Sequence, residues 1–519
     1  MFSNSSSQLQ PTPEGQRVDI SSIGRTNKLH SEEEELYIRN VLLAAESLLQ
    51  SEIVDDGLQR WETVDLIGRC KIALAPQLLP DVLGSIFHSC GETRVQFPLG
   101  GIDQDLRLLS ITHVCSAWRQ LALEMPALWS NIGVHLSKDA DLEQHNKTLS
   151  SARQWFNRAQ GMRRSLFIHF NAGWNANLNP HLQDTWKKLL EFMAQYRLGE
   201  LDLICPMNHV ALKVPDHVWP SIERLHLKPS DGGRESVGQQ LFSNFAKLSN
   251  LRYLKISNFY NLDGVYPIVP WHQLRTFEGG PVTPSWCLYA LRQSRLLERC
   301  CITLSKESIT SPVVSKEERI VLTNIDYLTA EFQHALWVSM FLRPLFMPNI
   351  TTFKLSLSRD GFEEKLIYQM SALIGIIQRS GGMRRIRRLE IGPTSEVLDI
   401  GTLLELLPSL ESISIEDGLL SDDSVRRLSS GKLGPRLCNI YLNILHDADQ
   451  ILSMVESRHQ NTLDSEDTPC PFKSISIPCE TTLQESSCRN DRIKLLSEKC
   501  HASISLDVKV RYRFRTDRY

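Results

Sequence analysis

The side chains that could carry chemistry are scattered along this sequence and do not form the spacing of a known kind of active site. His446 lies close to Asp447 and Asp449, and an imidazole beside carboxylates can act in general acid–base catalysis. With 15 histidines and 60 acidic residues in the chain, one such triplet is expected by chance. The motifs H-E-x-x-H, G-x-S-x-G, G-x-x-x-x-G-K-S/T and G-x-G-x-x-G are all absent. We therefore predict that the protein is not an enzyme and binds no cofactor.

The twelve cysteines do not form a metal-binding pattern. No two have C-x-x-C spacing, and the adjacent Cys300 and Cys301 suit neither a mutual disulfide nor a tetrahedral zinc site. Residues 1–16 lack the apolar core of a secretory signal, and no uncharged apolar stretch is long enough to span a membrane. We expect a cytoplasmic or nuclear protein with free thiols, no metal site and no membrane contact.

Length and composition indicate an ordinary soluble globular protein. The chain has 519 residues, of which 42% are hydrophobic and 23% charged, and its formal net charge is −3. This near-balance of charge argues against a dedicated nucleic-acid binder. The length allows either about three domains or one elongated array of repeats.

The elements that would position any functional residues begin with helices. Residues 1–30 lack apolar periodicity and predict a disordered tail. A helix region over 31–75 opens with four glutamates, which suit the positive end of a helix dipole. Two short amphipathic helices then follow, over 78–87 and 108–122, separated by a loop over 91–105 and ended by Pro126. This pair has a dense apolar surface for its length, which favours a partner, although packing within the chain is the commoner outcome.

The segment 78–132 resembles the F-box, in the form common among proteins of mushroom-forming fungi. The resemblance lies in Leu78-x-Pro80-Asp81-Val82-Leu83-x-x-Ile86-Phe87, in Leu109-Ser110-x-x-x-Val114-Cys115-x-x-Trp118-Arg119-x-x-Ala122, and in the tail Pro126-x-Leu128-Trp129-Ser130. It implies that residues 76–135 form an F-box that docks on the Skp adaptor protein, which links to a cullin–RING ubiquitin ligase.

The resemblance also implies which residues face Skp, each acting through apolar burial. By motif position they are Leu78, Pro80, Val82, Leu83, Ile86, Phe87, Val114, Cys115 and Trp118. Pro80 and Trp118 are the expected hot spots, because Trp is enriched at such positions and a rigid Pro loses little entropy on binding. The alternative is that Leu109, Val114 and Trp118 hold the module's own helices together.

The remaining residues, 136–519, contain a recurring pattern of three apolar positions typical of a short strand. Good matches are Ile222/Leu225/Leu227, Leu251/Leu254/Ile256, Ile350/Phe353/Leu355, Ile386/Leu389/Ile391, Leu410/Ile413/Ile415 and Leu437/Ile440/Leu442. Helical stretches between them are predicted at 240–248, 330–341, 364–377, 401–407 and 422–428. The array resembles a degenerate leucine-rich repeat domain, so the expected fold is α/β: a helical F-box module followed by an irregular solenoid with a parallel sheet.

Residues on the outward side of these strands would line the concave face of such a solenoid and bind a protein substrate. The candidates are Arg224, His226, Tyr253, Lys255, Lys354, Arg388, Glu390 and Tyr441. A solvated surface without a ligand explains any one of them equally well. We therefore predict a substrate receptor of a Skp–cullin–F-box ligase. A repeat scaffold without cullin coupling and an undetected hydrolase or transferase remain as alternatives.

Overall fold

The computed structural model describes residues 32–510 apart from 51–65, 68–69, 71–79, 92–93, 99–106, 115, 172–179, 206–213, 230–243, 259–268, 306–318, 334–336, 358–369, 382–383, 394–396, 417, 444–445, 464–468, 482–485 and 501–502. The predicted tail over 1–30 and most of the connection over 51–79 lie outside these residues.

The chain divides into two compact units. The first comprises Met1–His135 and Asn146–Leu166, and the second comprises Leu136–His145 and Phe167–Tyr519. The first unit extends past the predicted boundary at residue 135, because Trp155 packs into it. The Trp155 ring lies edge-on to Trp129 at 4.6 Å and to Phe97 at 5.7 Å between centroids. These three rings form a shared apolar core that the motif alone did not indicate.

Helices make up most of the first unit. α1 (Glu32–Gln50) carries the four glutamates in its first turn, and Glu35 pairs with Arg39 one turn later. α3 (Pro80–Gly91) begins at a proline. Proline lacks a backbone N–H, but an N–H at the first position of a helix has no partner within the helix, so nothing is lost there. α4 (Arg107–Val114) and α5 (Ser116–Leu123) lie where a helix was predicted, and Cys115 between them is outside the described residues.

A 3₁₀ turn, a strand pair and most of helix α6 (Leu142–Arg158), which carries Trp155, also belong to this unit. The turn Pro126–Trp129 is fixed by the Trp129 indole, whose Nε1 donates to the carbonyl of Ala122 at 2.8 Å. β1 (Val95–Phe97) pairs in parallel with β2 (Asn131–Ser137), with Phe97 opposite Val134. The prediction of a loop throughout 91–105 was therefore wrong for Val95–Phe97, where an alternating apolar pattern of three residues was too short to stand out.

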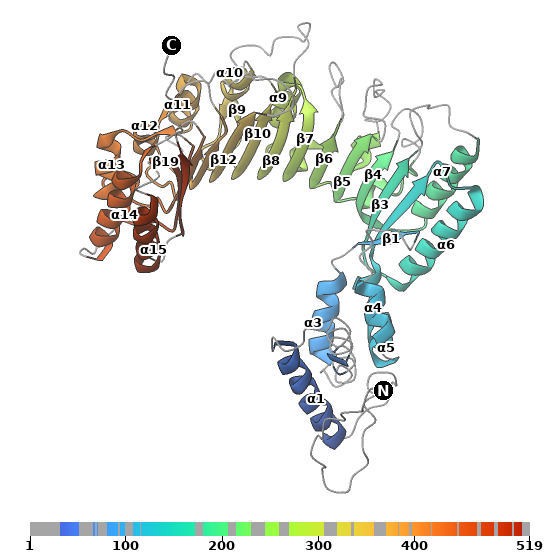
Figure 1. Cartoon of the computed structure of the whole chain (residues 1–519). Coiled ribbons are helices and arrows are strands. Elements are labelled where there is room, and N and C mark those ends of the chain that lie inside the picture. Colours follow the sequence, from blue (N-terminus) through green and yellow to red (C-terminus); the bar gives the residue numbers. More distant parts are fainter. Residues whose placement is uncertain are drawn as a thin grey trace, which may run out of the picture. The chain divides into compact units, whose positions relative to one another are not determined.

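The second unit contains a long parallel sheet in which most strands pair with the next strand along the chain (Figure 1). The strands follow in the order β4 (Leu198–Cys205), β5 (Arg224–Pro229), β6 (Tyr253–Ser257), β7 (Thr276–Val282), β8 (Arg299–Leu304), β10 (Tyr327–Phe332), β12 (Thr352–Leu357), β13 (Arg388–Ile391), β15 (Ser412–Ile415), β17 (Asn439–Leu442) and β19 (Ser474–Thr481). β18 (His446–Asp447) and β20 (Ser503–Val510) both pair with β19.

One face of this sheet is the core of the unit. Its central column consists of Leu201, Leu225, Leu254, Phe277, Cys300, Leu328, Phe353, Leu389, Ile413, Ile440 and Ile475, each in register with the next. Every member is at most 3% exposed. Burying one such side chain contributes roughly 1.5–3 kcal/mol. The expected α/β class with a parallel sheet is thus confirmed.

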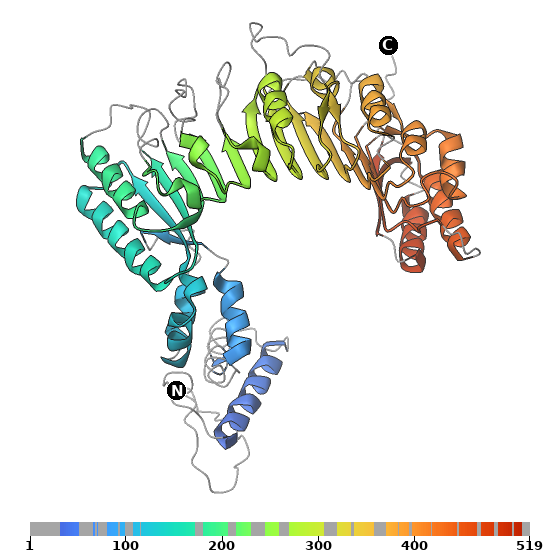
Figure 2. The same cartoon turned by 180° about the vertical axis from the view of Figure 1, so that it is seen from behind.

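Helices follow one side of the sheet along its length (Figure 2). They include α7 (Pro180–Met193), α9 (Pro284–Gln293), α10 (Trp337–Leu342), α11 (Met370–Arg379), α12 (Ile400–Leu406), α13 (Asp422–Ser429), α14 (Ala448–Leu463) and α15 (Ser486–Cys500). The helix predicted over 330–341 was wrong in its first part, because residues 330–332 belong to β10. The small Ala330 occupies a core position of that strand and hid the apolar alternation.

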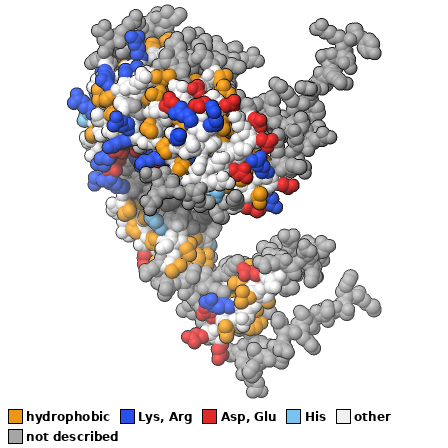
Figure 3. Space-filling model, turned by 90° about the vertical axis from the view of Figure 1, so that its left-hand side faces the viewer, with side chains coloured by type: hydrophobic (Ala, Val, Ile, Leu, Met, Phe, Trp, Pro, Cys, Tyr) orange, Lys and Arg blue, Asp and Glu red, His pale blue; other side chains and the backbone are white. Residues whose placement is uncertain are grey.

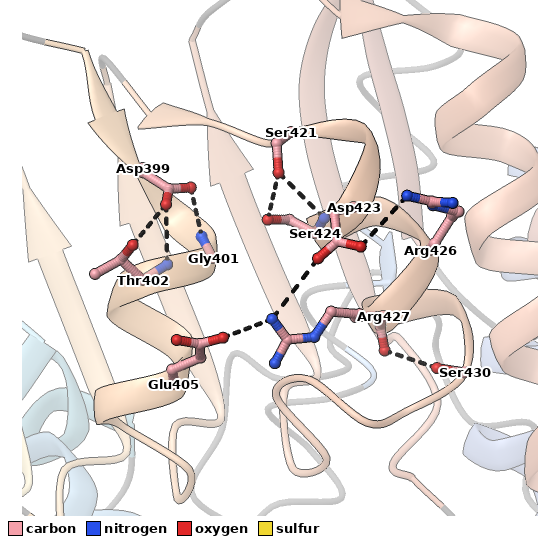
Figure 4. Close-up of polar contacts among 10 residues, drawn as sticks. All are labelled: Asp399, Gly401, Thr402, Glu405, Ser421, Asp423, Ser424, Arg426, Arg427 and Ser430. Atoms are coloured by element: carbon pink, nitrogen blue, oxygen red, sulfur yellow. Dashed lines mark hydrogen bonds and ion pairs between the residues drawn. The ribbon is translucent and has the colours of Figure 1, made fainter.

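Side-chain caps fix where the later helices begin (Figure 4). Asp399 accepts hydrogen bonds from the N–H groups of Gly401 and Thr402 at 3.0 and 3.3 Å, and Ser421 accepts one from Ser424 N–H at 3.2 Å. A cap of this kind contributes about 1 kcal/mol. Arg427 of α13 then joins the two helices through Glu405 of α12, at 2.5 Å. The surface over α13 and α14 shows basic and acidic side chains interspersed (Figure 3).

Candidate interaction surfaces

Helix α3 divides the predicted Skp-facing residues into two groups. Leu83 and Phe87 are 5% and 0% exposed, whereas Val82 and Ile86 are 44% and 40% exposed. A helix turns 100° per residue, so positions 83 and 87 share one side and positions 82 and 86 share another. One side of α3 therefore builds the unit's core, and the other presents two branched apolar side chains to solvent.

Trp118 belongs to the buried group. Its side chain is 9% exposed, and its ring meets Phe87 edge to face with 5.2 Å between centroids. This ring packs α5 against α3, which favours the alternative that Trp118 holds the module's own helices together, and its role as a docking hot spot stays a prediction. Val114 is half-buried, and Pro80 starts α3, although its side chain is not described. Leu78 and Cys115 lie outside the described residues.

The exposed side of α3 has the chemistry of a helix-docking surface. Ser85 and Ser89, both exposed, flank the Val82–Ile86 pair, and the Ser89 hydroxyl donates to the Ser85 carbonyl at 3.2 Å. Small side chains beside two apolar ones allow a partner to approach closely. Leu83 and Phe87 pack the opposite side of the same helix into the core. Val82 and Ile86 are therefore held on a rigid element and would lose little conformational entropy on binding.

The predicted substrate-binding residues all lie on the second sheet face, opposite the buried column. This polar face consists of the strand positions that alternate with the core, and its register places residues of successive strands side by side. One row runs Glu200, Arg224, Tyr253, Thr276, Arg299, Tyr327, Thr352, Arg388, Ser412 and Asn439. A second row runs Asp202, His226, Lys255, Glu278, Cys301, Thr329, Lys354, Glu390, Ser414 and Tyr441.

Two cation–π stacks occur at matching places in the first row. The guanidinium of Arg224 lies over the Tyr253 ring at 4.2 Å, and that of Arg299 lies over the Tyr327 ring at 4.2 Å. Arg224 also contacts Glu200 at 3.4 Å. The second stack was missed from sequence, because the strand that carries Tyr327 was not recognised. These planar stacks stiffen the polar face.

Side chains of the second row contact one another in pairs, and two of these are ion pairs of Lys with Glu. The imidazole of His226 lies 2.9 Å from Asp202, Lys255 lies 3.0 Å from Glu278, and Lys354 lies 2.6 Å from Glu390. Burial, and then the charge of Glu278, raise the pKa of the Tyr253 phenol far above its usual value, so the ring stays neutral. This part of the face offers partners a neutral, pre-organised pattern of donors and acceptors and little net charge.

The polar face changes character from β13 onward. Arg388 is exposed, its neighbours in the row are Thr352 and Ser412, and within the described chain its guanidinium makes no ion pair. Tyr441 is 45% exposed, beside Ser414 and close to Asn439. Tyrosine, serine and asparagine are the side chains that adaptable protein-binding surfaces favour. Arg388 and Tyr441 are therefore the candidates here that remain open to a partner.

Two of the three residues that suggested acid–base chemistry, Asp447 and Asp449, have structural roles, and the His446 side chain lies outside the described residues. Asp447 caps α14 by accepting the Asp449 N–H at 2.8 Å, and Asp449 pairs with Arg492 of α15 at 3.3 Å. Cys287 and Cys300 are buried, and burial raises the pKa of both thiols, which keeps them protonated. Over the described residues, no group of three or more His, Cys, Asp or Glu side chains is placed to hold a metal ion. No helix among those residues has the length and apolar character of a membrane span.

No protein-family model and no curated protein matches this chain.

Proposed function

We propose that this chain is the substrate-recognition adaptor of a Skp–cullin–F-box type ubiquitin ligase. The observation that supports this most is the two-sided helix α3, in which Leu83 and Phe87 pack inward while Val82 and Ile86 point outward. An apolar pair left on a rigid helix end of a small unit suits a partner that completes its burial. In this proposal Skp is that partner.

The second unit supplies substrate binding in this proposal. Its strand-by-strand sheet suits a leucine-rich-repeat-like solenoid, a fold class whose sheet faces commonly recruit proteins. The polar face around Arg388 and Tyr441 would contact the substrate, while the paired charges from β4 to β13 keep the rest of the face ordered. A ligase adaptor of this kind works in the cytoplasm, the nucleus or both.

A scaffold that binds proteins without cullin coupling is the second candidate. Leu83, Phe87 and Trp118 are buried in the unit's own core. This favours the scaffold, because buried side chains offer Skp less apolar surface to contact. The two functions differ in one consequence. An adaptor delivers its substrate for destruction, whereas a scaffold leaves the abundance of its partners unchanged.

Proximity labelling in cells, with and without inhibition of cullin activation, separates the two. The chain is fused to a labelling enzyme, and labelled proteins are quantified in both conditions. For an adaptor we expect Skp and a cullin among the labelled proteins, and a set of further partners that accumulates when cullins are inhibited. Labelling of Skp with no partner that accumulates would support the scaffold. Labelling without Skp would contradict both the adaptor and the F-box assignment.

A further inference from the structure

Three arginines from three separate segments converge where helices α10 and α11 end. Arg343 directly follows α10, Arg379 is the last residue of α11, and Arg319 directly precedes β9 (Ile320–Val321). All three are exposed. The Arg319 Nη2 donates to the Arg379 carbonyl at 3.1 Å, and the Arg379 Nη2 donates to the Leu342 carbonyl at 3.3 Å. We call these three residues the arginine cluster.

The backbone holds this cluster in place. The N–H of Ile320 donates to the Pro344 carbonyl at 2.8 Å, which fixes Arg319 beside the end of α10. The N–H of Met347 donates to the Ser380 hydroxyl at 3.1 Å, which fixes the end of α11 to the same segment. The Arg319 guanidinium also lies over the Phe346 ring at 3.7 Å. The charges of Arg319 and Arg379 are thus held in place before any ligand arrives, and the Arg343 backbone is fixed at the end of α10.

The positive charge of the arginine cluster exceeds the negative charge of the helix C-termini beside it. Cations commonly lie at helix C-termini, and each terminus supplies about half a negative charge. Two termini therefore offset about one of the three positive charges. Within the described chain, none of the three guanidiniums forms an ion pair with a carboxylate. Burial, and then the neighbouring charges of Arg319 and Arg343, lower the pKa of Arg379, so the cations repel one another.

We propose that the arginine cluster binds a phosphate group, carried either by a phosphorylated protein segment or by a small phosphate compound. The remaining charge of about +2 matches a phosphate monoester, which carries about −1.5 to −2 at neutral pH. Arginine suits this ligand because its planar guanidinium donates two parallel hydrogen bonds to phosphate oxygens. All three arginines belong to the second unit.

Calorimetric titration of the full chain at constant ionic strength tests the proposal. The probes are inorganic phosphate, a short peptide with one phosphoserine among alanines, and the same peptide without phosphate. The variant is Arg343→Gln, because the Arg343 side chain holds no described hydrogen bond that the fold would lose. The matched control is Arg426→Gln on α13, an exposed arginine whose side chain contacts Asp423 at 3.4 Å.

We expect the wild type and Arg426→Gln to bind inorganic phosphate equally, and Arg343→Gln to bind it about tenfold more weakly, the loss typical of one charged hydrogen bond. Binding of the phosphopeptide at least as tight as that of phosphate would identify a protein segment as the source. Binding of phosphate with rejection of both peptides would identify a small compound. Equal affinity of Arg343→Gln and wild type, or an equal loss in Arg426→Gln, would overturn the proposal.

Discussion

Phe87 of α3 and Trp118 of α5 meet edge to face, with ring centroids 5.2 Å apart and an angle of 66° between the rings. This contact joins the two halves of the F-box-like motif, which are 31 positions apart in the sequence numbering. Because it uses the largest side chain of the second half, it explains why that half has a Trp even though the ring is withdrawn from solvent. In the proposed function, the exposed Val82 and Ile86 of α3 would contact the partner instead.

Replacing Trp118 by Ala should destabilise the first unit by about 3–5 kcal/mol, the usual cost of removing a buried aromatic ring. Replacing the exposed Val82 by Ser should change stability by less than about 0.5 kcal/mol. Hydrogen–deuterium exchange in peptides from α3 to α5 measures both. Equal protection in wild type and Trp118→Ala would contradict the assignment of Trp118 to the core.

The stack of Arg224 on Tyr253 should contribute about 0.5–1 kcal/mol, since Arg224 is largely exposed and its ion pair with Glu200 is screened by solvent. A double-mutant cycle with Arg224→Ala and Tyr253→Leu, followed by urea unfolding, measures this coupling. The pair Arg299 and Tyr327 provides an internal repeat of the measurement, because its guanidinium lies at the same distance of 4.2 Å from the ring. A coupling of zero in both cycles would remove the stiffening role given to these stacks.

Arg458 of α14 is fully buried, its hydrogen bonds to described residues all go to main-chain carbonyls, and its guanidinium lies over the Phe472 ring at 4.6 Å. It donates to Cys470 O at 2.8 Å, Leu428 O at 3.0 Å and Gly434 O at 2.8 Å. Burial lowers its pKa to about 10, so it stays charged at neutral pH.

Arg458→Met should cost more than about 3 kcal/mol, because several buried carbonyls lose their donors at about 1–3 kcal/mol each. Arg458→Lys should recover only part of that loss. Urea unfolding measures both variants, and a neutral Arg458→Met would mean that water replaces the guanidinium.

The buried imidazole of His145 should make the fold sensitive to mild acid. Its Nε2 donates to the Ser137 carbonyl at 2.9 Å, and its Nδ1 lies 3.0 Å from the Thr185 hydroxyl. Burial lowers the pKa of His145, so the folded state favours the neutral ring. The unfolded chain binds this proton more readily, and stability is therefore full above about pH 6.5 and is lost as the pH falls below it. Thermal unfolding between pH 5 and 8 should show a smaller pH dependence for His145→Gln than for the wild type.

The sequence predicted the strand cores well, because residues such as Leu225, Leu254 and Ile413 repeat a pattern that only a half-buried strand explains. It also placed Arg388 and Tyr441 on the open face of the sheet. Two strands were not predicted because their apolar pattern is weak. β10 has the small Ala330 at a core position, and β1 has three residues, which are too few to recognise. No local pattern could indicate Arg458 or the arginine cluster, because their partners come from segments that only the fold brings together.

The proposed function depends most on Val82 and Ile86, and co-purification with Skp tests them directly. The variant is Val82→Ser/Ile86→Ser in the full chain. The control is Val321→Ser/Leu419→Ser in the second unit, where the two side chains have similar exposures of 51% and 43%. We predict that wild type and control retain Skp at one molecule per chain, and that the α3 variant retains at least tenfold less. Absence of Skp from the wild type, or equal retention by the α3 variant, would contradict the account.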